Sequence, residues 1–432
     1  MILRSKNIEN RICVIDGYPG CGKTSWAIQE INKLSDNVQI MFITPYLEEV
    51  QRIIDSCPDK EFVQPDRLLG YGRKITHLLS LIQNGMNIVS THALFTNIND
   101  ELIEELKKKN YILFLDEVFS AVEKWHIDSD RTSETRDEIT KKDIQTLIKR
   151  GLVEVNDDFS IKWSHDTDHL SKYERLRNLA NRGLLYFVNN SMLLWSFPID
   201  VFREEVFSEV YIMTHRFESQ IQGYYYNYFN LEYGTYNLAF ANNQYELKKG
   251  FPQEESWKRK TKEKIHIVEN RKINRIGDVY YDIRNHPWDS ALSSTWYDKH
   301  DEEIPTLKKN MNNFFQHMGK CGAEERMWTC FKKNTQALKG TYASDGKHVS
   351  LNARATNDYG HKTSLAYLIN RFTDPFFESF FLQRGILISQ EEYALSDMLQ
   401  WIFRSSIRNN QEIRLYVPSY RMRTILQNYL SC

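Results

Sequence analysis

The residues with the clearest chemical potential in this 432-residue chain are Gly17–Thr24, which read G-Y-P-G-C-G-K-T. They fit the pattern G-x-x-x-x-G-K-[ST] of phosphate-binding P-loops (Walker A), whose backbone N–H groups wrap the phosphates of a nucleotide. Lys23 would reach the β- and γ-phosphates, and the Thr24 hydroxyl would bind Mg²⁺. The remaining contacts to an ATP–Mg²⁺ complex are expected from the rest of the loop and the next residue: Gly17, Gly20, Cys21, Gly22 and Ser25.

A second chemical signal is the pair Asp116-Glu117, which follows the apolar run at residues 111–115. An acidic residue at the C-terminal tip of a strand beside a P-loop can hold the Mg²⁺ shell, and Asp116 is expected to do so. A glutamate directly after it can activate the attacking water. Glu117 therefore favours hydrolysis over transfer of the phosphoryl group to another hydroxyl.

These residues need a sheet to position them, and the sequence around them predicts one. Apolar runs typical of buried parallel strands lie at 12–16, 38–44, 85–91 and 111–115. Helical patterns separate them, at about 25–34, 46–55 and 74–84. Strands that alternate with helices predict an α/β fold, an open parallel sheet that binds its ligand at the C-terminal ends of the strands.

The chain is long enough for two or three domains, and we expect a first lobe at 1–245 with an insertion at about 121–180. The insertion begins with a charged, helix-like stretch and contains a predicted β-hairpin, residues 152–155 and 159–163. A helix followed by a hairpin is either a structural embellishment or a small nucleic-acid-binding wing. Further strand-like runs follow at 184–188, 192–196 and 209–214.

The expected second lobe spans 246–432, with the Lys- and Arg-rich stretch 244–276 as a linker or lobe boundary. Strands are predicted at 326–331, 348–351 and 412–417, and one helix at 391–407. On that helix Gln400, Arg404 and Arg408 are four residues apart and would form one stripe. Such a stripe is either a solvated face or a set of donors for a triphosphate, with an arginine finger that neutralises charge on the γ-phosphate.

Several short blocks, in order, resemble the motifs of superfamily 2 helicases of the DEAD/DEAH type. Gly17–Thr24 is similar to motif I and Asp116–Phe119 to motif II, while weaker likenesses lie at 42–45 (motif Ia), 89–92, 196–198 (motif III), 351–358 (motif V) and 400–408 (motif VI). The chain looks most like the compact helicase-like proteins of bacteriophages and mobile elements. The resemblance implies two RecA-like lobes with parallel sheets, and contacts from Thr44, His92 and Arg354 to nucleic acid.

The chain departs from the helicase pattern at three places. Phe403 stands where motif VI has glycine, and the last arginine, Arg408, comes one residue late. Ser196-Phe-Pro198 lacks the Ser-Ala-Thr of motif III. Only about ten residues precede the first strand, which leaves no room for the upstream adenine-reading glutamine element of DEAD-box proteins.

Composition restricts the class of protein further. The net charge of −1 gives no global attraction to nucleic acid, so binding would depend on local patches such as the arginine-rich segment after residue 404. The six cysteines form no C-x-x-C pair, and no zinc-ligand spacing is present, so Mg²⁺ is the only metal implied. Without an apolar leader or an 18-residue apolar run, we expect a cytoplasmic protein with no membrane contact. The aromatic run 223–229 is expected to pack in a core.

Three functions stay open from the sequence. The leading one is a nucleic-acid-dependent ATPase that translocates on, unwinds or remodels DNA or RNA. Its substrate would be single-stranded or branched DNA, or RNA, and replication or recombination proteins would be its partners. The second is a packaging-type P-loop motor or a P-loop kinase. The third is a helicase-derived protein whose nucleotide switches the binding of a partner.

Overall fold

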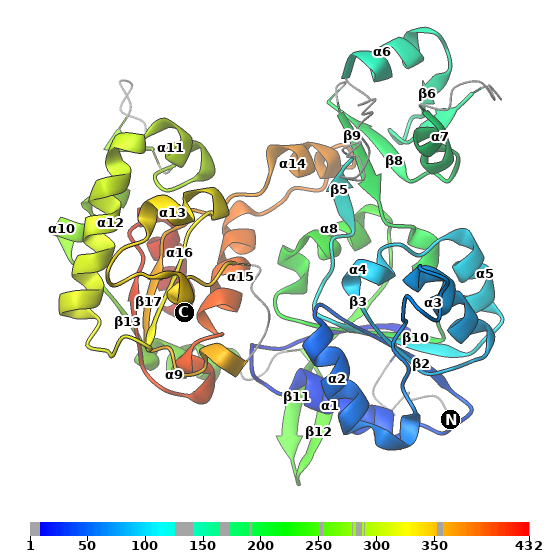
Figure 1. Cartoon of the computed structure of the whole chain (residues 1–432), viewed down its shortest axis with the longest axis horizontal. Helices are drawn as coiled ribbons and strands as arrows, with labels where there is room; N and C mark the ends of the chain where they lie inside the picture. The colour runs from blue at the N-terminus through cyan, green and yellow to red at the C-terminus, as the bar shows by residue number, and fades with distance from the viewer. Residues whose placement is uncertain are drawn as a thin grey trace. The chain divides into compact units, whose positions relative to one another are not determined.

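The computed structural model describes residues 9–125, 141–164, 173–189, 192–250, 254–278, 280–281, 287–288, 290–351 and 357–431. The chain forms two compact units (Figure 1). The first comprises Met1–Val14, Thr24–Gly234 and Asp374–Ile388, and the second comprises Ile15–Lys23, Thr235–Thr373 and Ser389–Cys432. The two lobes predicted from the sequence, 1–245 and 246–432, differ from these units in three respects. The phosphate loop groups with the second unit, the second unit begins again at Thr235, and residues 374–388 return to the first.

A seven-stranded sheet carries the predicted site. Its strand order is β12-β11-β1-β10-β4-β2-β3, and β10, β4, β2 and β3 pair in parallel. The two strands at one edge of the sheet, β11 and β12, form an antiparallel hairpin. The predicted α/β class is therefore confirmed. The strands are β1 (Ile12–Asp16), β2 (Gln39–Thr44), β3 (Ile88–Thr91), β4 (Tyr111–Asp116), β10 (Glu209–Thr214), β11 (Gly234–Ala241) and β12 (Gln244–Lys249).

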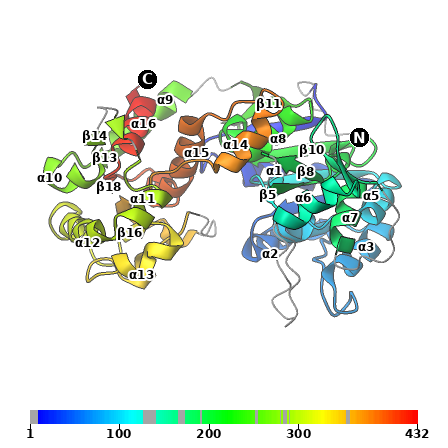
Figure 2. The same cartoon turned by 90° about the horizontal axis from the view of Figure 1, so that it is seen from above.

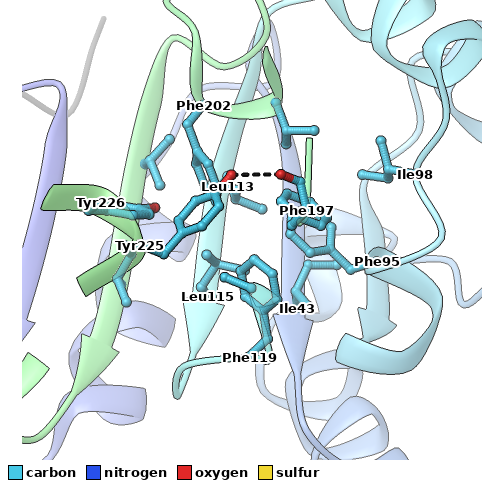
Figure 3. Packing of buried hydrophobic residues seen from close by; sticks show 14 of the residues in the cluster. Ile43, Phe95, Ile98, Leu113, Leu115, Phe119, Phe197, Phe202, Tyr225 and Tyr226 are labelled. Carbon is cyan, nitrogen blue, oxygen red and sulfur yellow. Dashed lines mark hydrogen bonds between the residues drawn. The ribbon is translucent and has the colours of Figure 1, made fainter. Parts of the chain in front are cut away.

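Helices accompany the strands of this sheet, and the four of them that begin at residue 74 or later contribute apolar residues to the main core of the first unit. They are α1 (Lys23–Lys33), α2 (Leu47–Ser56), α3 (Lys74–Gln83), α4 (His92–Phe95), α5 (Asp100–Lys107) and α8 (Ile221–Tyr228). Figure 3 shows the aromatic part of this core, where the Tyr225 hydroxyl donates to the backbone oxygen of Phe197 over 2.8 Å. Four tyrosines of α8 are buried, so the aromatic run is core, as predicted.

The insertion has a small core of its own. Its elements are β5 (Val122–Lys124), α6 (Lys141–Lys149), β6 (Val153–Val155), β7 (Ile161–Trp163), α7 (Glu174–Asn181), β8 (Leu185–Val188) and β9 (Met192–Ser196). The predicted hairpin is confirmed as β6 and β7, with Val153 opposite Trp163. Since β9 pairs with both β5 and β8, the insertion extends to residue 196 (Figures 1 and 2). Helix α14 (Pro375–Leu382) packs beside it through Phe380, which lies 5.3 Å from the ring of Tyr186.

The second unit contains a four-stranded parallel sheet in the order β13-β18-β17-β16. Two separate hydrophobic clusters pack against this sheet. A short hairpin, β14 (Tyr280–Tyr281) and β15 (Pro287–Trp288), accompanies it. The other elements are β13 (Ile265–Ile267), β16 (Arg326–Thr329), β17 (Ser364–Tyr367), β18 (Ile413–Tyr416), α9 (Glu254–Lys264), α10 (Arg271–Asn274), α11 (Ser294–Lys299), α12 (Ile304–Asn313), α13 (Thr335–Leu338), α15 (Gln390–Ile402) and α16 (Tyr420–Ser431).

Three predictions for the second half are wrong. The stretch 244–276 is not a linker, because it forms β12, α9, β13 and α10. The run 348–351 is not a strand and makes only an isolated bridge, between His348 and Trp328. The helix predicted to reach 407 ends at Ile402. In the described part of the chain, no helix is long and apolar enough to cross a bilayer.

Candidate functional site

The phosphate loop connects β1 to α1 in a conformation that depends on glycine. Gly20 and Gly22 have φ angles of +82° and +98°, in the left-handed region that side chains with a Cβ rarely adopt. A Cβ on Gly17 would lie 2.6 Å from the Cys21 sulfur, and one on Gly22 would lie 2.4 Å from the ring of Tyr245 in β12. The loop is therefore a tight cradle that substitution would distort.

The Lys23 side chain lies inside the loop and bonds to its backbone. Its Nζ atom donates to the backbone oxygens of Gly17 over 2.7 Å and Tyr18 over 3.3 Å, and the side chain is buried. A buried ammonium group needs acceptors, and here the loop's own carbonyl oxygens provide them. The same group can exchange these oxygens for those of a bound phosphate.

Two side chains of the second unit, to which the loop itself belongs, hold the loop in place. The buried Asn237 of β11 donates from Nδ2 to the backbone oxygen of Asp16 over 2.8 Å, at the residue just before the loop. The Tyr18 ring stacks on Trp257 of α9, with centroids 5.0 Å apart and planes at 21°. The Cys21 thiol lies in the same packed region, and burial raises its pKa. Asn237 and Trp257 have no motif around them and could not be identified from the sequence.

Asp116 ends β4 opposite the first turn of α1. The Thr24 hydroxyl lies 3.4 Å from Asp116 Oδ1 and is oriented to donate to it. No group of three or more His, Cys, Asp or Glu side chains that could hold a metal occurs among the described residues. One carboxylate and one hydroxyl suit Mg²⁺, which keeps several waters and takes other ligands from phosphate oxygens. Thr24 and Asp116, the predicted metal ligands, are thus adjacent and chemically suited to that ion.

Glu117 has an unusual backbone conformation that fixes its direction. Its φ angle is +63°, which costs a non-glycine residue about 1–3 kcal/mol. The backbone N–H of Glu117 donates to the oxygen of Met213 over 2.9 Å, and its Oε2 accepts a hydrogen bond from Thr214 Oγ1 over 3.0 Å. The neighbouring strand β10 therefore holds both the backbone and the side chain of this glutamate.

Thr214 is itself oriented by Gln220. Gln220 Nε2 donates to Thr214 Oγ1 over 2.9 Å and to the backbone oxygen of His215 over 2.6 Å, and both side chains are buried. Because the threonine hydroxyl accepts from Gln220, its own proton is available for Glu117. A chain of three side chains thus leads from Gln220 through Thr214 to the carboxylate.

Ser196–Pro198, the position expected for motif III, does not lie on a strand of the large sheet, so that assignment is wrong. Ser196 ends β9 in the insertion, is buried, and donates to the backbone oxygen of Phe197 over 3.2 Å. The strands beside β4 are β2 and β10, and on β10 Met213 lies opposite Asp116. Parallel neighbouring strands end at the same edge of a sheet. The apolar run 209–214 could therefore have indicated that its last residue, Thr214, lies beside the acidic pair.

The residues predicted to contact nucleic acid are placed differently. The Thr44 side chain is fully buried, so a contact from it to nucleic acid is not supported. His92 Nε2 lies within hydrogen-bond distance, 3.0 Å, of the Asp116 backbone oxygen, and burial lowers its pKa to about 4. The neutral ring therefore supports the end of β4. Arg354 lies outside the described residues.

The predicted stripe on one helix is broken. Helix α15 ends at Ile402, and the Ser405 hydroxyl donates to the Ile402 backbone oxygen, which terminates the helix. Arg404 then donates from Nη1 to the backbone oxygens of Leu351 over 2.7 Å and Ser350 over 3.4 Å.

The other two residues of the stripe are separated by this helix end. Gln400 stays in the last turn of α15, whereas Arg408 is exposed in a short 3₁₀ helix, Ser406–Asn409. The three side chains therefore do not share one helix face, although each could still act individually.

Known proteins share parts of this sequence and fold. Residues 259–430 match the family described as the YonV C-terminal Rossmann-like domain, and residues 134–195 match the YonV middle domain. The middle domain coincides with the insertion, and the C-terminal domain with the four-stranded sheet. Among solved structures, apo XPD superposes with a TM-score of 0.50 at 12% identity, covering 100% of this chain and 96% of that one. Xpd4 of S. tokodaii gives a TM-score of 0.45 at 11% identity, over 97% and 94% of the two chains.

At 12% identity the likeness to apo XPD is one of fold alone, and it agrees with the predicted α/β class. A closer relative is the SPbeta prophage-derived protein YonV of Bacillus subtilis strain 168. It is 36% identical over 430 residues, which covers 97% of this chain and 98% of YonV. A prophage-derived relative agrees with the resemblance to phage helicase-like proteins. At this identity and coverage, the chain belongs to the YonV family.

Proposed function

We propose that this chain is an ATP hydrolase of the helicase type, whose turnover depends on nucleic acid. The observation that carries the proposal is the division of roles between the two acids that end β4. Asp116 faces the Thr24 hydroxyl, whereas Glu117 is turned to Thr214. Neighbouring carboxylates held by different partners can serve different functions, one at a metal and one at a water molecule.

The phosphates would be bound by the cradle already described. The backbone N–H groups of the loop and the N-terminus of α1 favour anions. Lys23 would exchange the oxygens of Gly17 and Tyr18 for phosphate oxygens, at little desolvation cost because the ammonium group is already buried. Thr24 and Asp116 would hold Mg²⁺, which neutralises charge on the β- and γ-phosphates.

Glu117 would orient the attacking water and take its proton. Thr214 donates to Oε2. The other carboxylate oxygen, Oε1, can then accept the proton of a water molecule placed in line with the γ-phosphate. The bond from Thr214 fixes the direction of the carboxylate before substrate binds, so less ordering is required during reaction. Arg404 and Arg408 remain the candidate finger residues of the second unit, Gln400 a further donor.

Three alternative functions are less well supported. A P-loop kinase transfers phosphate to an acceptor and has no need of a glutamate oriented toward water. A packaging motor usually carries a nuclease cluster of carboxylates, and the described residues include no cluster of acids, histidines and cysteines able to hold a metal. A nucleotide-switched binding protein would share the whole cradle and differ only in slow turnover.

The proposed partner is single-stranded or branched DNA, with RNA as the alternative, and the proposed location is the cytoplasm of a bacterial cell. Phosphate release should be measured with and without poly(dT) and poly(U). We expect the wild-type rate to rise at least several-fold with one of them. Lys23→Ala should abolish turnover, while Lys33→Ala, at the far end of the same helix and paired with Glu30, should not. A rate that no polynucleotide changes would reject nucleic-acid dependence.

A further inference from the structure

The loop between the 3₁₀ turn Pro58–Lys60 and helix α3 exposes apolar side chains to an unusual degree. Leu68 is 90% exposed, Leu69 68% and Tyr71 95%. Three of the four consecutive residues 68–71 are therefore large hydrophobic residues exposed to solvent. Single exposed apolar residues are ordinary on a protein surface, but a contiguous group usually marks a binding site. We call residues 66–74 the tyrosine loop.

The tyrosine loop has a fixed shape. Asp66 Oδ1 accepts hydrogen bonds from the backbone N–H groups of Leu68 over 2.6 Å and Leu69 over 3.4 Å. The Asp66 N–H in turn donates to Nδ1 of the buried His77, over 2.9 Å. The Gly72 N–H closes the turn on the Arg67 oxygen over 2.8 Å. The exposed side chains are therefore carried by a preorganised turn.

The backbone of this turn is strained at the tyrosine. Tyr71 has a φ angle of +51°, and it stands between two glycines. A Cβ on Gly70 would lie 2.1 Å from the Arg73 backbone oxygen, and Gly72 has a φ angle of +89°. A non-glycine residue in the left-handed region is tolerated where the surrounding structure enforces it, commonly at ligand contacts. Here the strained residue is an aromatic ring that is almost wholly exposed.

The loop leaves the sheet at the edge that carries the candidate site. Val63 pairs in parallel with Ile88 of β3, and the Val63 N–H donates to the Asn87 oxygen over 2.9 Å. The segment after Val63 therefore emerges at the C-terminal edge, where β3 ends in Thr91 and β4 in Asp116. Nucleic-acid contacts were predicted at this edge from Thr44 and His92, which the structure buries or bonds internally.

The charge around the ring indicates an anionic partner. Arg67, Arg73 and Lys74 flank Tyr71, against the single carboxylate of Asp66, which is bonded to the turn. The first turn of α3 contains no acidic residue. Cations beside an exposed aromatic ring are the combination that binds single-stranded nucleic acid, since phosphates pair with the cations and bases stack on the ring.

We propose that the tyrosine loop is a contact site for single-stranded nucleic acid, with Tyr71 as the stacking platform for a base and Arg67 and Arg73 as phosphate contacts. Leu68 and Leu69 extend the apolar surface beside the ring. The proposal rests on the proposed nucleic-acid dependence and names the part of the surface that supplies it. Stacking tolerates any base, so the contact would have little sequence preference.

Fluorescence anisotropy with a labelled dT oligonucleotide and a U oligonucleotide, without nucleotide, tests this on the full chain. Tyr71→Asn removes the ring while keeping a residue that tolerates positive φ. We expect it to weaken binding between about 5-fold and 150-fold, the range for loss of one base stack. Tyr71→Phe should bind as the wild type does. Phe240→Ala removes another exposed aromatic side chain, 61% exposed on β11, and should leave affinity unchanged.

The contribution of the arginines can be measured separately, from the salt dependence of binding. Arg67→Ala should lower the slope of log affinity against log salt by about 0.7, which corresponds to one phosphate contact on a single strand. If the wild type binds oligonucleotide and Tyr71→Asn binds equally well, the tyrosine loop is not the contact, although nucleic-acid dependence stands. If the wild type binds neither oligonucleotide, both proposals fail. Loss of binding to anionic phospholipid vesicles in Tyr71→Asn, with oligonucleotide binding unchanged, would assign the loop to a membrane surface and overturn the proposal.

Discussion

Thr214 donates a hydrogen bond from Oγ1 to Glu117 Oε2 over 3.0 Å, across 97 residues of sequence. The bond joins the ends of two adjacent parallel strands, β10 and β4. It gives Glu117 a fixed direction that Asp116, one residue earlier, does not share. The two acids of the motif are thereby separated into a candidate metal ligand and a candidate base.

Removal of the Thr214 hydroxyl should slow turnover without weakening nucleotide binding. Thr214→Val keeps the shape of the side chain but leaves Glu117 without its donor. Misplacing a reacting group can cost on the order of 100-fold, so we expect kcat to fall by about 10-fold to 100-fold. KM for ATP should stay within about twofold of the wild type, since the hydroxyl does not touch the phosphate loop.

Two variants separate positioning from a general loss of structure. Thr214→Ser restores the donor and should recover most of the rate. Gln220→Leu removes the group that orients Thr214 and should produce a smaller loss of the same kind. Equal kcat in Thr214→Val and the wild type would show that the hydrogen bond has no catalytic role.

Arg404 should contribute to stability as well as to any role at a phosphate. Its two hydrogen bonds to the oxygens of Leu351 and Ser350 attach that segment to the end of α15. Hydrogen bonds from a charged donor contribute about 1.5–3 kcal/mol, so Arg404→Ala should lower the free energy of unfolding by about 1–3 kcal/mol. Urea denaturation followed by tryptophan fluorescence measures this.

The matched control is Arg408→Ala, which removes an exposed arginine from the same segment. Its free energy of unfolding should remain within about 0.5 kcal/mol of the wild type. If Arg404→Ala is as stable as the wild type but loses turnover, Arg404 acts at the phosphate alone and its bonds to the 350–351 segment carry no weight.

The parallel strands of the first unit and the phosphate loop were predictable because local sequence and tertiary structure agree there. The strands β1, β2, β3 and β4 are buried apolar runs, and Gly20 and Gly22 of the loop have positive φ angles that favour glycine. Lys23, Thr24, Asp116 and Glu117 could be named because their spacing is set by one strand–loop–helix unit and one strand end.

The rest depended on contacts between distant segments. Thr214 became recognisable only once β10 was seen to lie beside β4. The predicted stripe of Gln400, Arg404 and Arg408 is wrong because its four-residue spacing continues in the sequence beyond Ile402, where the helix ends. There the Ser405 hydroxyl donates to the Ile402 backbone oxygen. The tyrosine loop has a loop-like sequence, and only the structure shows that its ring is exposed on a rigid turn.

Cysteine reactivity gives a pH-dependent test of the fold and of the cradle. Burial raises the pKa of Cys57 from 9.0 to about 11, so at pH 8 its thiolate fraction is about 100-fold below that of an ordinary thiol. In a Cys432→Ser background, Cys57 should resist alkylation at pH 8. Its rate should rise about tenfold per pH unit until the pH approaches 11.

Cys21 lies in the phosphate loop, is partly exposed, and should be alkylated slowly because burial raises its pKa too. ATP with Mg²⁺ should protect it further, while the half-exposed Cys321 of the second unit should show no protection. Mass spectrometry of tryptic peptides measures each site. Equal alkylation of Cys21 with and without ATP–Mg²⁺ would place nucleotide binding elsewhere.

The most direct test of the central claim is the steady-state ATPase rate of wild type and Glu117→Gln, each with and without saturating single-stranded DNA or RNA. We predict that the wild type hydrolyses ATP faster with the strand. Glu117→Gln should bind ATP–Mg²⁺ normally but hydrolyse it about 100-fold or more slowly, because the amide cannot accept the proton of water. A Glu117→Gln variant that keeps the wild-type rate, or a wild type that no strand stimulates, would contradict this account.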